Sequence, residues 1–127
     1  MTDKSPLISE KQSFNVDEFL ENQNYDYDFI PEMIQMFDET INLYSKTLQD
    51  NYLNNNLYEF KKNLHALKGS LKVFFAKDSL STCETIESIL KTKDSLDVVD
   101  ELFNQLKLEI IMISQELVNF NKEIDVT

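Results

Sequence analysis

The segment that shows most clearly how this chain folds is Leu57-Tyr-Glu-Phe-Lys-Lys-Asn-Leu-His-Ala-Leu-Lys-Gly-Ser-Leu-Lys-Val-Phe74. An α-helix has about 3.6 residues per turn, so apolar residues three and four positions apart lie on one face. The segment follows this spacing throughout. We therefore predict an amphipathic helix from about Leu57 to Ala76, with a buried stripe made of Leu57, Phe60, Leu64, Leu67, Leu71 and Phe74.

A segment of the same kind precedes it, from about Phe29 to Asn54. Asp28 and Pro31 suit its first turn, where backbone N–H groups have no partner within the helix. The polar run Asn54-Asn55-Asn56 suits the turn that ends it. Its apolar stripe also repeats at steps of four and three residues, and consists of Ile30, Ile34, Phe37, Ile41, Tyr44 and Leu48.

Two further helices are expected after residue 76. Asp78 or Ser79 suits the N-cap of the third helix, whose pattern breaks at Lys91-Thr-Lys-Asp94. Asp94 or Ser95 suits the start of the fourth. The stripes are Leu80, Cys83, Ile86 and Leu90 in the third helix, and Val99, Leu102, Leu106, Ile110, Ile113, Leu117 and Phe120 in the fourth.

Four amphipathic segments with short connections are typical of an antiparallel four-helix bundle, so we predict an all-α fold. A shorter helix around Val16–Asn22 is expected to lie across one end of the bundle. The predicted organisation is a flexible N-terminal arm over residues 1–13, one bundle over residues 14–122 and a C-terminal tail over residues 123–127.

The composition of the 127 residues excludes several classes of protein. The chain has one Gly, whereas phosphate loops and dinucleotide fingerprints need several. Its one His and one Cys are too few for the common zinc sites, and we expect no metal and no intrinsic cofactor. The net charge of −11 disfavours general binding to nucleic acid, because binding to the phosphates requires local positive charge on the protein.

The sequence shows no sign of membrane insertion or secretion. No run approaches the ~18 apolar residues of a transmembrane helix, and residues 1–13 lack the long apolar region of a signal peptide. The single Cys, Cys83, cannot form a disulfide within the chain, which suits a reducing compartment. Because Cys83 lies on an apolar stripe, we expect a buried structural thiol. We expect a monomeric cytoplasmic domain.

The only Gly, Gly69, lies inside the predicted second helix, four residues after the only His, His65. A Gly inside a helix costs about 1 kcal/mol relative to Ala, and residues four apart are neighbours on a helix surface. A rotation of about 100° per residue places His65 about 120° from the centre of the buried stripe, on the exposed side. The same rotation brings Lys61, Lys68 and Lys72 near it, with a strip of smaller side chains formed by Ala66 and Val73.

This combination favours acceptance of a phosphoryl group. An imidazole with a pKa near ~6.5 is largely unprotonated, and so nucleophilic, at neutral pH. Nearby lysines stabilise an anionic group during transfer, and a Gly leaves room for a partner to approach. A hydrolase triad would need a nucleophile motif and an oxyanion hole, which are not evident. Each feature also has an ordinary explanation when it is taken alone. His65 would be a surface residue, the lysines a solvated helix face, and Gly69 a contact between helices.

The run His65-Ala-Leu-Lys-Gly-Ser70 resembles the His-x-Leu-Lys-Gly-Ser signature of the histidine-containing phosphotransfer (HPt) domains of two-component phosphorelays. The chain also has Ala76, Cys83, Ile86 and Glu87 where that family commonly has Ala, Cys, an aliphatic residue and Glu. The resemblance implies a four-helix bundle with an exposed His midway along one helix. It implies a phosphorelay intermediate, without enzyme activity of its own, that accepts a phosphoryl group from a receiver-domain aspartyl phosphate or a hybrid histidine kinase and passes it to another receiver aspartate.

The resemblance also implies roles for individual residues. His65 would be phosphorylated, Lys68 would stabilise the phosphoryl group, Gly69 would give clearance and Ser70 polar support. Mg²⁺ is expected only on the partner receiver domain. The remaining residues expected to support docking of the partner are Lys61, Lys72, Ala66, Val73, Gln35 and Glu39.

Two positions depart from the family pattern. Phe75 stands where family members often have Gly, and Ser79 stands where an aliphatic residue is common. These departures bear on partner choice more than on phosphoacceptance. No ATP-binding or dimerisation segment of a histidine kinase is visible, so we expect a relay intermediate. The alternatives are a non-catalytic helical adaptor for receiver or kinase domains and an acidic inhibitor or nucleic-acid mimic, which the spacing of the carboxylates does not support.

Overall fold

Five helical elements follow one another in the computed structural model, which describes Glu18, Glu21 and residues 28–125. They are the α-helices α3 (Ile30–Leu53), α4 (Leu57–Val73), α5 (Lys77–Leu90) and α6 (Asp100–Asp125), with a short 3-10 helix, η1 (Leu96–Val99), directly before α6. These residues contain no strand. The predicted arm of residues 1–13 lies outside the described residues, and so does the predicted helix around 16–22 apart from Glu18 and Glu21.

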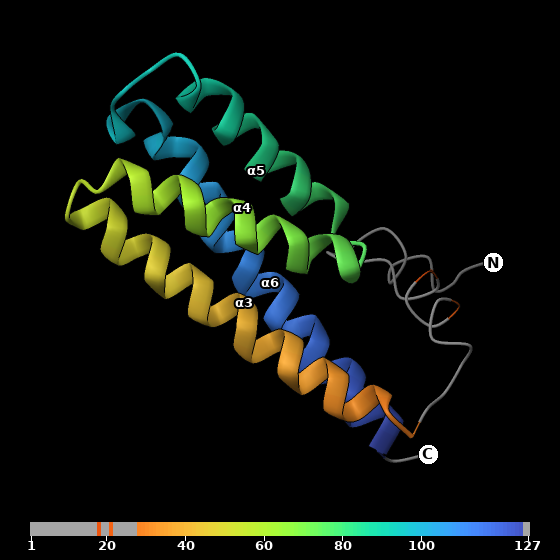
Figure 1. Cartoon of the computed structure of the whole chain (residues 1–127). Helices are drawn as coiled ribbons and strands as arrows, with labels where there is room; N and C mark the ends of the chain where they lie inside the picture. Colours follow the sequence, from red (N-terminus) through yellow and green to blue (C-terminus); the bar gives the residue numbers. More distant parts are fainter. Residues whose placement is uncertain (1–17, 19–20, 22–27, 126–127) are drawn as a thin grey trace.

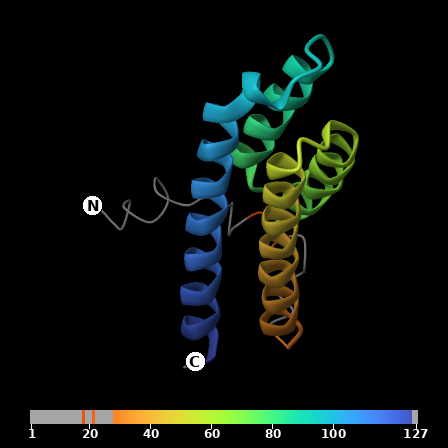
Figure 2. The same ribbon diagram turned by 90° about the vertical axis from the view of Figure 1, so that its left-hand side faces the viewer.

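The four α-helices form an antiparallel bundle (Figure 1). α3 packs against α4 and α6, and α5 packs against the same two helices. α3 and α6, with 24 and 26 residues, are longer than α4 and α5, with 17 and 14. Figure 2 shows that the first half of α3 and the second half of α6 extend beyond the other two helices. The predicted four-helix architecture is therefore confirmed.

Most residues of the predicted stripes meet in the core, while Tyr44, Leu57 and Phe120 pack against it and are only partly buried. Two further positions differ from the prediction. Near the start of α6, Phe103 is buried in place of the predicted Leu102, which is only partly buried. The Phe103 ring lies 5.2 Å from that of Tyr52 and 5.2 Å from that of Phe60, so it fills the space between α3, α4 and α6. In α5 the predicted Leu80 is only partly buried, and the hydroxyl residues Ser79 and Thr82 are buried beside it.

The connection between α3 and α4 is the predicted asparagine turn. Asn55 has a φ of 52°, a left-handed conformation that Asn tolerates better than most residues. The N–H of Asn56 donates to the carbonyl of Asn51 at 2.8 Å and closes the end of α3. Asn56 then caps α4, because its side chain accepts a hydrogen bond of 3.2 Å from the N–H of Glu59.

The end of α4 differs from the prediction. The helix ends at Val73, three residues before Ala76, because the backbone turns at Phe75, whose φ is 57°. The N–H of Ala76 donates to the carbonyl of Leu71 at 3.0 Å, which satisfies an acceptor at the helix end. The left-handed conformation suits Gly best. A Gly at position 75, as in the resemblance, would have this freedom, whereas here a half-buried Phe packs against the core.

The start of α5 also differs, because neither Asp78 nor Ser79 caps it. The first helical residue is Lys77, and the N-cap position belongs to Ala76, which has no side-chain acceptor. The N–H of Leu80 donates to the Ala76 carbonyl at 3.0 Å. Asp78 instead lies in the first turn, where a negative charge complements the helix dipole.

The remaining helix ends agree in part. Ser95 is an N-cap as predicted, but it caps η1, and the α-helix that follows begins at Asp100. Pro31 lies in the first turn of α3 as predicted, while Asp28 precedes that helix. α6 continues to Asp125, so residues 123–125 are helical although the predicted tail includes them.

Candidate functional site

His65 lies at the midpoint of α4, and 79% of its side chain is exposed. The buried residues of α4 are Phe60, Leu64, Leu67 and Leu71, which face the rest of the bundle. The helix phase fixed by that stripe turns the imidazole toward solvent. The exposure predicted from the helical rotation is therefore confirmed.

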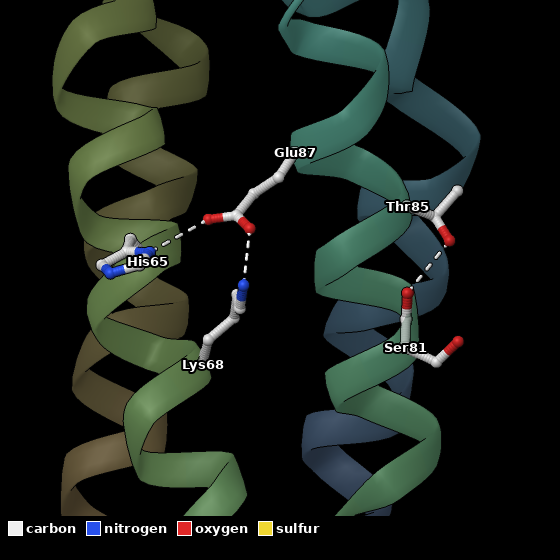
Figure 3. A network of polar contacts seen from close by, with 5 residues as sticks. All are labelled: His65, Lys68, Ser81, Thr85 and Glu87. Carbon is white, nitrogen blue, oxygen red and sulfur yellow. Dashed lines mark hydrogen bonds and ion pairs between the residues drawn. The ribbon is translucent and has the colours of Figure 1, made fainter.

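A carboxylate from the neighbouring helix faces the imidazole (Figure 3). Oε2 of Glu87, in α5, lies 3.4 Å from Nδ1 of His65. The other oxygen, Oε1, accepts a hydrogen bond of 2.7 Å from Nζ of Lys68. One side chain of α5 thus connects two residues of α4 that lie about one turn apart. We refer to these three side chains as the histidine site.

Lys68 is directed across the helix interface to Glu87. The side chains of Lys68 and Glu87 are 22% and 23% exposed, so water screens the pair only in part. The hydrogen bond from Lys68 to Glu87 raises the pKa of Lys68 above its usual value of 10.5. The ammonium group is therefore charged throughout the neutral range, and it holds the carboxylate in place.

The carboxylate gives the two ring nitrogens of His65 different surroundings. An ionised carboxylate only accepts hydrogen bonds, so an interaction with Nδ1 requires a proton on Nδ1. In the neutral ring with that proton, Nε2 carries the free electron pair. Figure 3 shows the second ring nitrogen on the side of the ring away from Glu87. The site can therefore offer Nε2 as a nucleophile to a group that arrives from solvent.

The surface beside His65 is low and open, as predicted. Gly69 is exposed, and a β-carbon added there would meet no atom within 4 Å outside its own stretch of helix. Close helix packing is therefore not the reason for this Gly. Val73 is exposed on the next turn, while Ala66 and Ser70 are partly exposed.

A small apolar hollow adjoins this surface between α3 and α4. Its volume is about 270 Å³, and its lining includes Met36 from α3 with Ser70 and Val73 from α4. Met36 and Val73 are exposed apolar side chains. The face next to Gly69 therefore combines low relief with apolar surface.

The residues predicted on α3, Gln35 and Glu39, do not line this hollow. The side-chain amide of Gln35 donates to Oε2 of Glu39 at 3.2 Å, so the two are bonded to each other. The α3 side chains that do line the hollow include Met36 and Thr40. Met36 follows Gln35 by one position and Thr40 follows Glu39 by one position, so the lining residues lie about 100° further around the helix axis than the predicted ones.

The two other predicted lysines lie on the exposed surface of α4. Lys61 lines a hollow that it shares with His65. Lys72 lies in the last turn of α4, where a positive charge complements the helix dipole. The structure thus brings Lys61 and Lys68 to the neighbourhood of His65 and Glu87 and leaves Lys72 at the helix end.

Other chemistries have little support in the part of the chain that the structure describes. There, no group of three or more His, Cys, Asp and Glu side chains could hold a metal ion. None of the described helices has the length and apolar character needed to cross a membrane. Cys83 is fully buried, and burial raises the pKa of its thiol to about 12. The prediction of a buried structural thiol is confirmed.

Glu87 is the one residue of the histidine site for which sequence analysis predicted no role. It is 19 residues from Lys68 and on a different helix, so no periodicity connects the two. Their contact depends on the register of α5 against α4, which the turn at Phe75 and the core packing determine. The one available signal was the resemblance, which has a Glu at this position.

Comparison with known proteins supports the fold. No family model matches the chain, and no curated protein is significantly similar to it in sequence. The structure is similar to the crystal structure of the HPT domain from the Hpt sensor hybrid histidine kinase from Shewanella, with a TM-score of 0.76 over 87% of this chain and 95% of that one. The two sequences are 18% identical, so the likeness is one of fold. The antiparallel four-helix bundle of this chain therefore has the same fold as that HPT domain.

Proposed function

We propose that this chain is a phosphorelay intermediate that accepts a phosphoryl group on Nε2 of His65 from an aspartyl phosphate and passes it to another aspartate. The observation that carries the proposal is the position of Glu87, whose Oε2 lies 3.4 Å from Nδ1 of an otherwise solvent-exposed imidazole. This position favours Nε2 as the attacking atom. The fold and the run from His65 to Ser70 support the same chemistry.

In the proposed step, the electron pair of Nε2 forms the N–P bond while the bond between phosphorus and the aspartyl oxygen breaks. The carboxylate of the partner leaves with that electron pair. Nδ1 keeps its proton, so the ring becomes positively charged. Glu87 offsets this charge and holds the ring in position, as a carboxylate does behind other reacting imidazoles. Attack by a second aspartate reverses these changes and restores the neutral ring.

Lys68 contributes through its charge and its bond to Glu87. The 2.7 Å hydrogen bond fixes the carboxylate that orients His65. The ammonium group also places a positive charge about one turn from the imidazole, in a protein of net charge −11. That charge lowers the electrostatic cost of bringing an anionic phosphoryl group to the site.

The proposed partners are receiver domains of response regulators or hybrid histidine kinases. Their docking surface on this chain would be the low surface around Gly69 and the hollow beside Met36 and Val73. Exposed apolar side chains next to an open Gly suit a protein surface. The partner receiver would carry the Mg²⁺, and we propose a cytoplasmic monomer with no kinase or hydrolase activity of its own.

His65→Gln tests the proposal. The chain is incubated with receiver domains charged by labelled acetyl phosphate, and label on the chain is followed. We expect label that is lost in acid and retained in alkali on the wild type, as for a phosphoramidate, and none on the variant. The variant should retain its helical circular dichroism, because the His65 side chain is 79% exposed.

A second variant asks whether any exposed imidazole is sufficient. His65→Gln combined with Gln115→His carries an exposed His on α6, away from Glu87 and Gly69. We expect this double variant to remain unlabelled. Label on the single variant, or wild-type labelling of the double variant, would contradict the proposal.

Glu87→Gln tests the positioning role of the carboxylate. The amide keeps the shape of the side chain but cannot balance a positive ring or form an ion pair with Lys68. We expect transfer to His65 to slow by about tenfold or more, which corresponds to about 1.4 kcal/mol, and the fraction of rings with the proton on Nδ1 to fall in ¹⁵N NMR spectra.

Glu84→Gln is the matched control, because Glu84 is an exposed carboxylate one turn earlier in α5 that attracts Lys68 more weakly than Glu87 does. It should leave both the transfer rate and the ring tautomer unchanged. Equal behaviour of the Glu84 and Glu87 variants would remove Glu87 from the mechanism.

A further inference from the structure

A larger hollow lies between α4 and α5 and shares His65 with the histidine site. Its volume is about 780 Å³, and beside His65 and Glu87 its lining includes Tyr58, Lys61, Lys62 and Lys91. We call it the lysine groove. It extends from His65 toward the start of α4 at Leu57, which is about 12 Å along the helix axis at ~1.5 Å per residue.

The lysine groove is a positive region on an acidic protein. Among the described residues, Lys61, Lys62 and Lys91 are exposed and form no ion pair. The carboxylate in the lining, Glu87, is already bound to Lys68. The whole chain has a net charge of −11. A surface that complements the groove must therefore be locally acidic.

The lysine groove also has apolar surface. Tyr58 is 73% exposed, and the partly exposed Leu57 lies next to it in the lining. Lysines alone would attract any anion, but an exposed aromatic ring with an aliphatic neighbour gains from contact with apolar side chains. The combination fits a polypeptide segment with acidic and apolar residues better than a free phosphate.

We propose that the lysine groove binds an acidic segment of the partner protein, next to the aspartate that exchanges the phosphoryl group with His65. The identity of the partner rests on the function proposed above. A domain of ~100 residues has a radius of gyration of about 13 Å. A partner centred on His65 therefore covers a groove that begins at that residue. The groove contributes partner selectivity and association rate, because complementary charges outside the reacting centre act mainly on these quantities.

The test variant is Lys62→Glu/Lys91→Glu, which reverses two groove charges and leaves the residues assigned to transfer intact. The matched control is Lys46→Glu/Lys122→Glu, with the same change of charge at exposed positions of α3 and α6. Lys91 and Lys122 both lie at the C-terminal end of a helix, so any loss of dipole stabilisation is similar in the two variants.

The first measurement needs no partner protein. A short blocked peptide of aspartate and glutamate with a central leucine and phenylalanine is titrated into the ¹⁵N-labelled chain, with an asparagine and glutamine version as the control peptide. We expect amide shifts that cluster on Tyr58, Lys62 and Lys91 and that disappear in the groove variant only. No shifts in the groove of the wild type, or equal binding by both variants, would overturn the proposal.

The second measurement uses a receiver domain that labels His65. Its affinity is measured in a His65→Gln background, where binding is read without transfer. We expect the Kd to rise about tenfold for the groove variant, equivalent to about 1.4 kcal/mol, and less than about twofold for the control. Normal labelling of His65 with no effect of the groove variant would count against this inference alone. Binding of the acidic peptide without any labelling of His65 would count against the proposed function alone.

The Tyr58→Ser variant tests whether the acidic peptide also binds through apolar contacts in the lysine groove or through its charge alone. Its control is Leu108→Ser, which removes an exposed apolar side chain from α6. We expect severalfold weaker binding of the acidic peptide for Tyr58→Ser and no change for Leu108→Ser. If Tyr58→Ser binds the peptide normally and a DNA oligonucleotide displaces it, the groove is a general polyanion site and the proposal is wrong.

Discussion

Gly69 occupies an exposed position within α4 where its conformational freedom is not required. Its φ is not positive, and a β-carbon would meet no atom within 4 Å outside its own stretch of helix. A Gly in a helix interior costs about 1 kcal/mol relative to Ala. Neither the turn chemistry nor the packing of the bundle accounts for that cost. Within the proposed function, the approach of a partner to His65 accounts for a Gly at this position.

Substitution of Gly69 therefore separates stability from docking. Gly69→Ala should raise the Tm by about 3–5 °C, because about 1 kcal/mol is recovered. Gly69→Gln should leave the fold intact and reduce transfer, because the longer side chain occupies the docking surface. Thermal melts and receiver-transfer assays on the same samples measure both effects.

Asn104→Gln, at an exposed position of α6, controls for added bulk elsewhere and should change neither quantity. A lower Tm for both Gly69 variants would mean that this residue serves packing, and the argument from Gly69 for a docking surface would be lost.

Single residues also show where sequence reasoning succeeds. The exposure of His65 and the openness at Gly69 follow from helix phase, which is a local property of α4. The Glu87 contact is between two helices, and no local rule gives the register of α5 against α4. Phe103 rather than Leu102 is buried because the ring fits beside Tyr52 and Phe60, and this choice depends on tertiary packing.

At the scale of elements, two connections between helices each contain a residue with a left-handed backbone conformation, and the two residues differ in how well they tolerate it. Asn55 after α3 and Phe75 after α4 both have positive φ, at 52° and 57°. Asn tolerates this conformation through its short polar side chain, whereas a bulky residue is strained there. Phe75 is partly buried against the core, so packing offsets its strain. Asn55 is exposed and has no such compensation.

Asn55→Gly should therefore stabilise the protein by about 0.5 kcal/mol, and Asn55→Ala should destabilise it by about 1 kcal/mol, because only Gly adopts a positive φ freely. Urea unfolding of the three proteins measures both differences. Stabilisation by Ala would show that the turn changes conformation in solution. Asn54→Ala, at the adjacent position with a φ of −89°, is the control for loss of a polar side chain.

Helix ends were less predictable than helix interiors. The asparagine run and Ser95 carried recognisable turn and cap chemistry, and both mark helix boundaries in the structure. At the boundary between α4 and α5 the recognisable cap residues, Asp78 and Ser79, lie inside α5, and the actual turn and cap residues, Phe75 and Ala76, are poor ones by local preference. Core packing of Phe75 determines that turn, so the sequence pattern placed the end of α4 three residues late.

At the scale of the whole molecule, three groups among the described residues hold their protons more strongly in the folded state. Burial raises the pKa of Cys83 from 9.0 to about 12. The hydrogen bond to Asp100 raises the pKa of Tyr52 from 10.0 to about 12. The hydrogen bond to Glu87 raises the pKa of Lys68 above 10.5. Because the unfolded chain loses these protons at lower pH, the folded state binds more protons under alkaline conditions.

These groups contribute their full stabilisation at pH values below their pKa values in the unfolded chain. The stabilisation is lost as the pH rises through their higher pKa values in the folded protein. We therefore expect the free energy of unfolding to fall between pH 9.0 and about 12. Urea unfolding across this range measures the slope. Cys83→Ala and Tyr52→Phe should each make the decline shallower.

Tyr58→Phe is the control, because Tyr58 is exposed and the hydroxyl that donates to Asp100 is that of Tyr52. It should leave the slope unchanged. A stability that stays constant to the upper end of the range would contradict the folded-state assignments of Cys83 and Tyr52.

The histidine site is divided between two helices that are consecutive in the chain. His65 and Lys68 belong to α4, whereas Glu87 belongs to α5. A chain still on the ribosome that has released only α4 would carry the imidazole without the carboxylate that orients it. Within the proposed function, a nascent or partly degraded chain is therefore a poor phosphoryl acceptor, and competence begins only when α5 has docked. The phosphorylated fraction would then report how much of the protein is correctly folded.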